Sequence, residues 1–187
     1  MTTTLDACAD LFRSGRARID ALAGGLPPQV ANCKPAADVW SVAEVVVHLN
    51  TLAADYLPAL EHTVAAALVS VSPPEALSFG LLGGVFVRLV GPAGRPVKTP
   101  AAMRPPQSSG TASALDAVAA LATFDADTDR FLGVIERARG VDAARVRVAS
   151  PFLPMLRLPL AAFLAGLGGH IHRHADQIER VLAETRT

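Results

Sequence analysis

Residues 168–178 read GGHIHRHADQI and hold three of the five histidines in this chain of 187 residues. Successive residues of an α-helix are turned by ~100°, so His170 and His174 are expected within ~40° of each other around the helix axis. Gln177 falls on the same side of this predicted helix, whereas His172 points to roughly the opposite side. The stretch therefore predicts a helix that presents two imidazoles, one turn apart, to the same neighbour.

Two imidazoles at this spacing form a ready pair of metal ligands, because each neutral ring offers a nitrogen lone pair to Zn²⁺, Ni²⁺ or Fe²⁺. The same spacing also arises when one histidine lies on the surface and the other forms an ordinary hydrogen bond in the core. The spacing alone leaves both interpretations open, and a further histidine upstream favours the metal site.

The composition is that of a helical protein with one core. The chain is 51% apolar, 18% charged and 5% aromatic, and its apolar residues are mainly alanine, leucine and valine, which favours packed helices. A chain of this length can bury a sizeable core. We therefore expect one domain spanning residues 1–187.

The charge balance sets expectations for partners and location. Seventeen basic and seventeen acidic residues cancel, so no net charge draws the chain to nucleic acid or to an anionic membrane. The N-terminus lacks the apolar core of a signal peptide, and the longest apolar run, residues 77–90, is too short to span a bilayer. Neither cysteine sits in a CxxC spacing, so we expect reduced thiols and a cytoplasmic protein. From the charge and the apolar runs we expect no nucleic-acid and no membrane partner.

Apolar residues recur at three- and four-residue spacing over residues 4–23, which predicts a first helix that ends at Gly24-Gly25. Residues 26–39 are expected to form a loop. A second helix opens with the capping box of Ser41 and Glu44, in which each side chain satisfies a backbone N–H of the other residue. In this second helix Trp40, directly before the cap, is expected to pack against Val45, and Pro58 to kink or end the helix.

His48 stands in the apolar middle of the second helix. An unpaired buried imidazole costs about 1–3 kcal/mol, so this ring needs a partner. One interpretation is a hydrogen bond to Tyr56, to a serine or to a backbone carbonyl, and the other is a metal ion shared with His170 and His174. Asp55, on the same helix face as His48, is interpreted as a solvated charge, with support of a metal ligand as the alternative.

Residues 70–112 form the least regular stretch, because their glycines and prolines disfavour both helix and central strand. A connection of this length is usually either disordered or functional, and its apolar first half argues against disorder. We expect it to cross one end of the molecule and to cover part of it. Arg95, Lys98 and Arg104 are interpreted as solvated charges, with contact to an anionic substrate as the alternative.

The third helix is expected to start at a capping pair, Ser113 and Asp116, and to end at Gly140. Val118 is assigned to its buried face. Residues 145–148 are predicted to be extended.

The last helix is predicted to run from Leu158 to about Glu184. Gly166, Gly168 and Gly169 lie in it, and each costs about 1 kcal/mol relative to alanine in a helix interior. Their clustering predicts either a close approach of the second helix or a local break.

Four amphipathic helices with two long crossings predict an all-α protein, a four-helix bundle, and bundles build metal sites from inward side chains on facing helices. His48 on the second helix, together with His170 and His174 on the fourth, could supply three nitrogen ligands. Three protein ligands leave one coordination position open, as in catalytic zinc sites. Water at that position has its pKa lowered towards neutrality, which makes hydroxide available as a nucleophile.

Two motifs of this chain resemble those of the DinB/YfiT-like metalloenzyme family. They are WSxxExxxHL at residues 40–49 and HxxxHxxQI at residues 170–178, with Lys98-Thr99-Pro100 in the connection between them. The resemblance covers nearly the whole chain. It implies a four-helix bundle with up-down-down-up connections and a long crossover between the second and third long helices, often assembled as a dimer.

The same resemblance implies a divalent transition metal bound by His48, His170 and His174, with Gln177 supporting the ligands. Zn²⁺ or Ni²⁺ is the expected ion, and Fe²⁺ and Mn²⁺ are the alternatives. Members of the family include thiol-dependent transferases and a mycothiol-dependent isomerase.

Two hypotheses about function follow. The first is a metal-dependent enzyme that acts on a small molecule, either as a hydrolase or as a transferase of a low-molecular-weight thiol, since a metal ion lowers the pKa of water and of thiols alike. The second is a non-catalytic metal-binding or stress-response bundle, or a dimerisation module. We expect a homodimer formed through an alanine-rich helix face.

Overall fold

The computed structural model describes residues 1–94, 99–106 and 112–185 and is 63% helical, which agrees with the expected all-α class. The α-helices of the described residues are α1 (Leu5–Ala23), α2 (Pro28–Asn32), α3 (Val42–Ala66), α4 (Gly80–Val90), α5 (Ala117–Ala138) and α6 (Leu160–Thr185), joined by a 3₁₀ turn η1 (Ala101–Met103). Two short antiparallel ladders pair β1 (Thr2–Thr3) with β2 (Leu77–Ser78) and β3 (Arg147–Ala149) with β4 (Arg157–Pro159).

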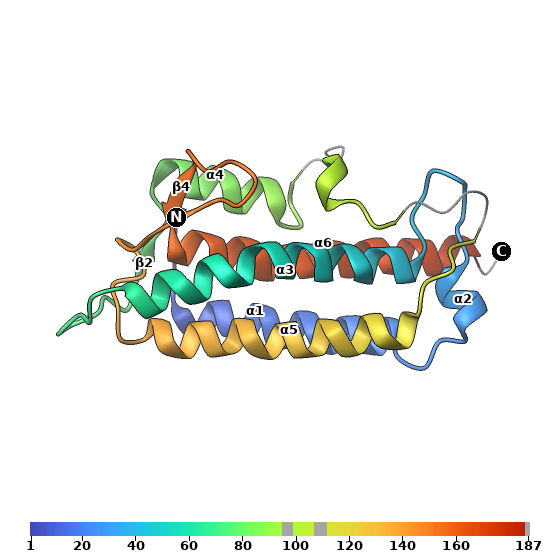
Figure 1. Ribbon diagram of the computed structural model, residues 1–187, viewed down its shortest axis with the longest axis horizontal. Coiled ribbons are helices and arrows are strands. Elements are labelled where there is room, and N and C mark those ends of the chain that lie inside the picture. The colour runs from blue at the N-terminus through green and yellow to red at the C-terminus, as the bar shows by residue number, and fades with distance from the viewer. Residues whose placement is uncertain (95–98, 107–111, 186–187) are drawn as a thin grey trace.

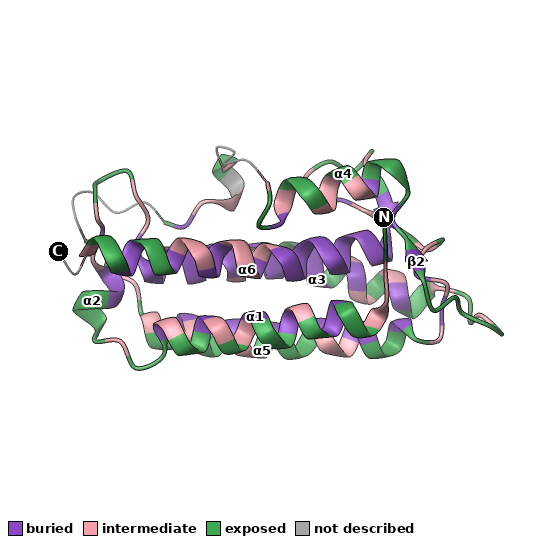
Figure 2. Ribbon diagram, turned by 180° about the vertical axis from the view of Figure 1, so that it is seen from behind, coloured by how far each residue is buried: buried purple, intermediate pink, exposed green. Residues whose placement is uncertain are grey.

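The four long helices lie side by side along the long axis of the molecule (Figure 1). Helix α1 packs against α5 and α6, and α3 packs against the same two helices. The colours of Figure 1 show that α1 and α6 run in one direction and that α3 and α5 run in the other. The buried residues line the space between these helices, and α6 is buried over most of its length (Figure 2).

The first helix follows its predicted limits. The Thr4 hydroxyl caps it by accepting a hydrogen bond from the Ala7 N–H at 3.0 Å, and Gly24 follows its last residue. The expected loop over residues 26–39 is wrong in part, because a short helix, α2, occupies its first half. Pro28 stands at the first helical position of α2, where its fixed φ suits a helix and its missing N–H leaves no bond unmade.

Helix α3 begins with the predicted capping box: the Ser41 hydroxyl accepts from the Glu44 N–H at 3.1 Å, and the Glu44 carboxylate accepts from the Ser41 N–H at 2.9 Å. Of the two effects expected at Pro58, a kink or an end of the helix, the end is wrong, because α3 continues to Ala66. Pro58 has no N–H to donate to the Ala54 carbonyl four residues earlier. Both residues are exposed, so water can donate to this carbonyl instead.

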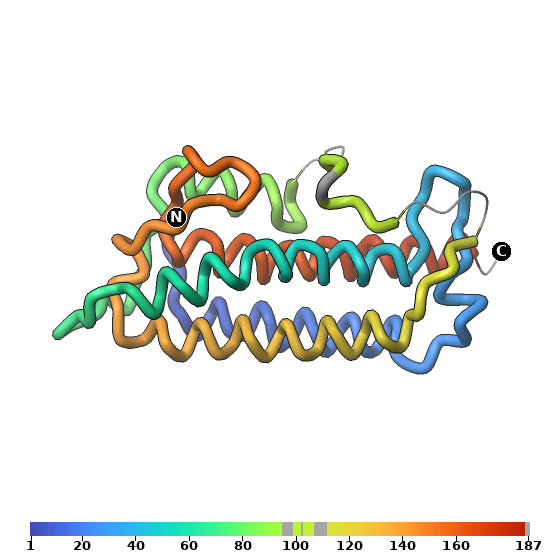
Figure 3. Tube along the Cα trace, viewed as in Figure 1, coloured from blue at the N-terminus to red at the C-terminus, as the bar shows by residue number. Residues whose placement is uncertain are grey.

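The long connection between α3 and α5 crosses above α6, as its path in Figure 3 shows. The prediction of an irregular chain is wrong for its first half, where α4 forms and packs against α6. A Cβ built on Gly83 meets the Ala162 Cβ at 2.9 Å. Glycine therefore permits the close approach of the two helices, and this packing outweighs its low helix propensity.

The start of α5 differs from the prediction in one residue. Asp116 caps the helix by accepting from the Ala119 N–H at 3.0 Å, whereas Ser113 lies outside the cap and shares a 2.9 Å hydrogen bond with the Ser41 hydroxyl. Val118, assigned to the buried face, is 72% exposed.

Helix α6 is continuous, so the predicted alternative of a local break at its glycines is wrong. A Cβ built on Gly168 meets Leu11 of α1 at 2.8 Å, and one built on Gly166 meets Phe86 of α4 at 2.5 Å. The close neighbours are therefore α1 and α4, and not the second long helix as expected. In the described part of the chain, no helix combines the length and the apolar character needed to cross a bilayer.

Candidate metal centre

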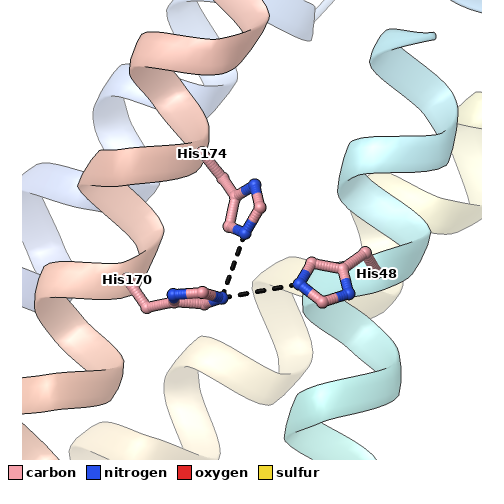
Figure 4. Close-up of side chains that lie close together, drawn as sticks. All are labelled: His48, His170 and His174. Carbon is pink, nitrogen blue, oxygen red and sulfur yellow. Dashed lines mark hydrogen bonds between the residues drawn. The ribbon is translucent and has the colours of Figure 1, made fainter. Parts of the chain in front are cut away.

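Two helices bring the histidines together from distant parts of the chain. His48 lies on α3, about two turns after the capping box that fixes where the helix starts, and it faces α6. His170 and His174 lie one turn apart on the facing side of α6 (Figure 4). His48 and His174 are buried, with 3% and 6% of their surface exposed, and His170 is partly buried.

The Nε2 atoms of the three rings converge. His170 Nε2 lies 3.0 Å from His174 Nε2 and 3.4 Å from His48 Nε2, and the three candidate ligand atoms all lie within 4.8 Å of one another. Nitrogens bound to a tetrahedral ion at about 2.0–2.1 Å are separated from each other by about 3.3 Å. The cluster therefore has the dimensions of a three-nitrogen metal site.

The other ring nitrogens determine which atoms of the imidazoles are free to bind a metal. His48 Nδ1 donates to the Met103 carbonyl at 2.6 Å, and His170 Nδ1 donates to the Val90 carbonyl at 2.9 Å. Because a carbonyl oxygen can only accept, both rings carry their hydrogen on Nδ1 and an unprotonated lone pair on Nε2.

The third ring is oriented by a side chain. His174 Nδ1 donates to the Gln177 amide oxygen at 2.8 Å, as expected for a residue that supports a ligand. All three Nε2 lone pairs then face one another at distances at which they repel. A cation between them removes this repulsion, and the residues present therefore fit a divalent transition metal.

Burial lowers the pKa of all three imidazoles, because the charged ring is poorly solvated in the interior. The pKa of His170 falls to about 4, and those of His48 and His174 also lie below the usual value. The neighbouring histidines and Arg173 lower the pKa of His170 and His174 further. The rings are therefore neutral near pH 7, which is the form that binds metals.

Trp40 belongs to the site, although its predicted role was to pack against Val45. Its ring centre lies 5.0 Å from that of His48 and 6.4 Å from that of His174, nearly parallel to the latter. This position was missed because Trp40 precedes the helix, so helical periodicity does not relate it to His48.

The hydrogen bond of His48 to a backbone carbonyl, one of the two interpretations of this residue, is present. Which carbonyls hold His48 and His170 was not predicted, because a carbonyl has no signature in the sequence. Both come from the long connection: Val90 is the last residue of α4, and Met103 is the last residue of η1. The connection therefore covers the site and also orients two of its rings.

Other candidate residues lie elsewhere. Asp55 is exposed, in agreement with its interpretation as a solvated charge, and His172 Nε2 donates to the Leu11 carbonyl at 3.1 Å on the far side of α6. Arg104 Nε donates to the Thr99 carbonyl at 2.8 Å. Arg95 and Lys98 lie outside the described residues.

Comparison with known protein families matches residues 11–178 to a family described as the DinB superfamily. This range contains all three histidines and Gln177. Neither the curated proteins nor the solved structures yielded a match to the chain.

Proposed function

The chain belongs to the DinB superfamily, and from this membership and the three converging imidazoles we propose that it is a metal-dependent enzyme whose ion is bound by His48, His170 and His174. The observation that carries the proposal is the orientation of the rings. Their Nδ1 atoms donate to oxygens outside the cluster, so their Nε2 lone pairs share one small volume.

Each residue of the proposed site has a defined task. The histidines bind the ion, Gln177 holds the His174 ring in its tautomer, and the long connection limits the access of water to the site. With three protein ligands the ion keeps one exchangeable position, and it supplies a Lewis acid that lowers the pKa of water or of a thiol placed there. Zn²⁺ or Ni²⁺ is the proposed ion, with Fe²⁺ and Mn²⁺ as alternatives.

Two reactions of small molecules fit the proposed site: hydrolysis, and transfer of a low-molecular-weight thiol. The chain's own contribution is the same for both, because neutral nitrogen ligands leave the ion its full positive charge and so favour an anionic fourth ligand. We propose these two reaction classes together, and an assay of each class is needed to choose between them.

A non-catalytic metal-binding protein is the second candidate, and one observation favours it. In the described residues, the cluster of candidate ligands contains histidines only, without an Asp, Glu or Cys that could act as a general base beside the ion. In that case the site serves stability or the sensing of metal.

The experiment compares wild type with His174→Ala and with His62→Ala, in which an exposed histidine of α3 is removed as the control. Protein purified without chelator and reloaded with Zn²⁺ or Ni²⁺ is expected to bind about one ion per chain, and His174→Ala much less. Binding of less than one ion by wild type contradicts both candidates. Hydrolase or thiol-transfer activity that persists in His174→Ala contradicts the enzyme but not the metal site.

We also propose the finer features that the family membership implies. The helix directions of Figure 1 support an up-down-down-up bundle with the long crossover between α3 and α5. We propose a homodimer through a helix face, for which a dimeric mass by light scattering is the test. We propose the cytoplasm as the compartment, supported by two free cysteines.

A further inference from the structure

The charges of this neutral chain are unevenly distributed. Residues 76–115 and residues 143–175 contain no Asp or Glu. These two segments supply α4, η1, β3 and β4, which form a layer over α3 and α6 in Figure 1. Within these segments Arg145 pairs with Asp142 at 3.6 Å, whereas Arg88, Arg147 and Arg157 form no ion pair with the residues that the structure describes. These three arginines are a local positive charge that the net charge of zero conceals.

The same layer exposes an apolar stripe on α4. Leu81 is 85% exposed, Val85 57% and Leu89 49%. Residues four apart share one helix face, so these side chains form a continuous stripe, beside which Leu82 and the cationic Arg88 are also exposed. Figure 2 shows exposed residues along the outer side of this helix.

The hairpin of β3 and β4 adds an apolar tip next to α4, with which β4 is in contact. Residues 151–156 read PFLPML, and within them Met155 is 98% exposed and Leu153 63% exposed. Behind this tip, Arg147 and Arg157 are both exposed.

The ladder explains why both arginines face solvent. Val148 pairs with Leu158, and both are buried. Because side chains alternate along a strand, the neighbouring Arg147 and Arg157 point to the opposite side. Two residues of chain span at most about 7 Å, so the separation of Arg157 from Met155 falls within the ~5–10 Å depth to which interfacial segments bury their apolar side chains.

We propose that this surface, which we call the α4–hairpin surface, binds the interface of a membrane containing anionic lipids. It is defined by Leu81, Leu82, Val85, Leu89, Leu153 and Met155, with Arg88, Arg147 and Arg157. The apolar side chains enter the region between head groups and acyl chains, and the arginines lie at the level of the lipid phosphates.

Charge complementarity selects this partner over a second copy of the chain. A two-fold symmetric dimer pairs the same patch with itself, so its contacts bring Arg88, Arg147 and Arg157, which form no ion pair with the described residues, towards the same arginines of the second copy. Anionic lipids supply the missing negative charge, and their acyl chains cover the apolar stripe. The expectation that a membrane is not a partner rested on the net charge of the whole chain and on the lack of an apolar run long enough to span a bilayer. The uneven distribution removes the first argument, and binding at the interface does not require a spanning segment.

The test measures co-sedimentation of the full chain with vesicles. One set contains phosphatidylcholine alone, and the other contains phosphatidylcholine mixed with phosphatidylglycerol. We expect binding to the mixed vesicles that weakens as salt is added, and little binding to phosphatidylcholine alone. Absence of binding to the mixed vesicles at low salt, or equal binding to both sets, overturns the proposal without any variant.

Variants locate the contact. Leu153→Ser combined with Met155→Ser is expected to weaken binding to the mixed vesicles at least tenfold. Arg147→Gln combined with Arg157→Gln is expected to weaken the same binding about fivefold for each arginine that is lost. Val118→Ser is the control, because the exposure of Val118, 72%, lies between those of Leu153 and Met155, and Val118 lies on α5. Circular dichroism verifies that each variant is folded.

Two outcomes contradict the assignment of this surface. The first is unchanged binding of the folded tip variant. The second is a dimeric mass by light scattering that becomes monomeric in Val85→Ser, because the surface then belongs to a second copy. Neither outcome depends on a bound metal ion, so the proposal stands or falls separately from the proposed function.

Discussion

Each of the three histidines is held by a hydrogen bond on the side of its ring that faces away from the cluster. His48 and His170 use the carbonyls of Met103 and Val90, and His174 uses the amide of Gln177. These bonds fix the tautomer of each ring and determine where its lone pair points. The affinity for a metal should therefore depend on residues that do not touch it.

Replacement of Gln177 tests this dependence. In Gln177→Leu the Nδ1 hydrogen of His174 loses its acceptor in a buried position, so the ring is no longer held in place. We expect Zn²⁺ affinity to fall about 10–100-fold, as is usual for such supporting residues, with the helical content unchanged. Titration against a competing chelator measures the affinity. Gln29→Leu, on the exposed side of α2, should bind like wild type, and equal affinities of all three proteins contradict the role of Gln177.

Acidification of the metal-free protein should destabilise it. Burial lowers the pKa of His170 to about 4, whereas in the unfolded chain it titrates near 6.5. Between these values the unfolded chain binds a proton that the folded chain does not, so the free energy of unfolding falls as the pH falls. From about pH 7 to about pH 5 the loss from His170 is on the order of 2 kcal/mol.

Urea unfolding in the presence of a chelator, at the two pH values, measures this loss. His170→Gln removes one of the three buried imidazoles and should reduce the pH dependence, whereas His62→Gln, which changes an exposed residue outside the cluster, should leave it unchanged. A metal-free wild type that is equally stable at both pH values contradicts the lowered pKa.

The sequence predicted which side chains form the cluster, because a four-residue spacing has a geometric meaning once a helix is assumed. His170, His174 and Gln177 follow from that spacing, and His48 from its apolar surroundings. The carbonyls of Val90 and Met103 could not be predicted, because their positions depend on how the long connection folds back over α6.

At the scale of whole elements, α6 approaches its neighbours through glycines. Gly168 faces the Leu11 Cβ on α1, and Gly166 faces the Phe86 ring on α4. The Leu11 Cβ is attached to the backbone of α1 and moves only when that helix moves. A methyl group is therefore tolerated less well at Gly168 than at Gly166. The glycines therefore determine how closely α1 and α4 pack against the helix that carries two of the histidines.

Two alanine substitutions separate packing from helix propensity. Gly168→Ala gains about 1 kcal/mol of helix propensity but places a methyl group 2.8 Å from the Leu11 Cβ. We expect a net destabilisation of about 1–3 kcal/mol from overpacking. Gly133→Ala, in the interior of α5, meets only the end of the Arg137 side chain at 3.6 Å and should stabilise the protein by up to about 1 kcal/mol.

The midpoint of urea unfolding should therefore move down in Gly168→Ala and up in Gly133→Ala. Movement of both midpoints upwards would mean that α1 shifts away at little cost, and would contradict the tight packing of α1 on α6.

The errors in predicting elements have a common physical cause. Proline and glycine in α3 and α4 predicted interruptions, because local propensity is visible in the sequence. Helix α4 forms nevertheless, because its glycines admit close packing on α6, and α3 passes through Pro58 because the affected carbonyl faces water. Tertiary contacts determined that α4 forms, and solvent access allowed α3 to continue past Pro58. A local sequence pattern shows neither the tertiary contacts nor the solvent access.

At the scale of the whole molecule, the hydrophobic core does not depend on the metal site. Buried apolar residues extend along all four long helices, from Cys8 and Phe12 on α1 to Val181 and Leu182 on α6. The histidine cluster involves one residue of α3 and two residues of α6 (Figure 4). A bound ion should therefore add stability to a fold that already exists, unlike in a small zinc finger, which is unfolded without its metal.

This view makes a prediction for removal of the metal. A ligand that binds only the folded state stabilises it by about 2.7 kcal/mol when present at about 100 times its dissociation constant. For a chain of this size, that gain raises the midpoint of thermal unfolding by roughly 5–10 °C. The chelated protein should remain helical at room temperature by circular dichroism and unfold at the lower temperature, and addition of Zn²⁺ should restore the higher one.

His62→Ala should respond like wild type, whereas His174→Ala should unfold at one temperature with or without Zn²⁺, because the ion has lost a ligand. Loss of helical signal on chelation at room temperature contradicts an independent core, and a full response of His174→Ala contradicts the site.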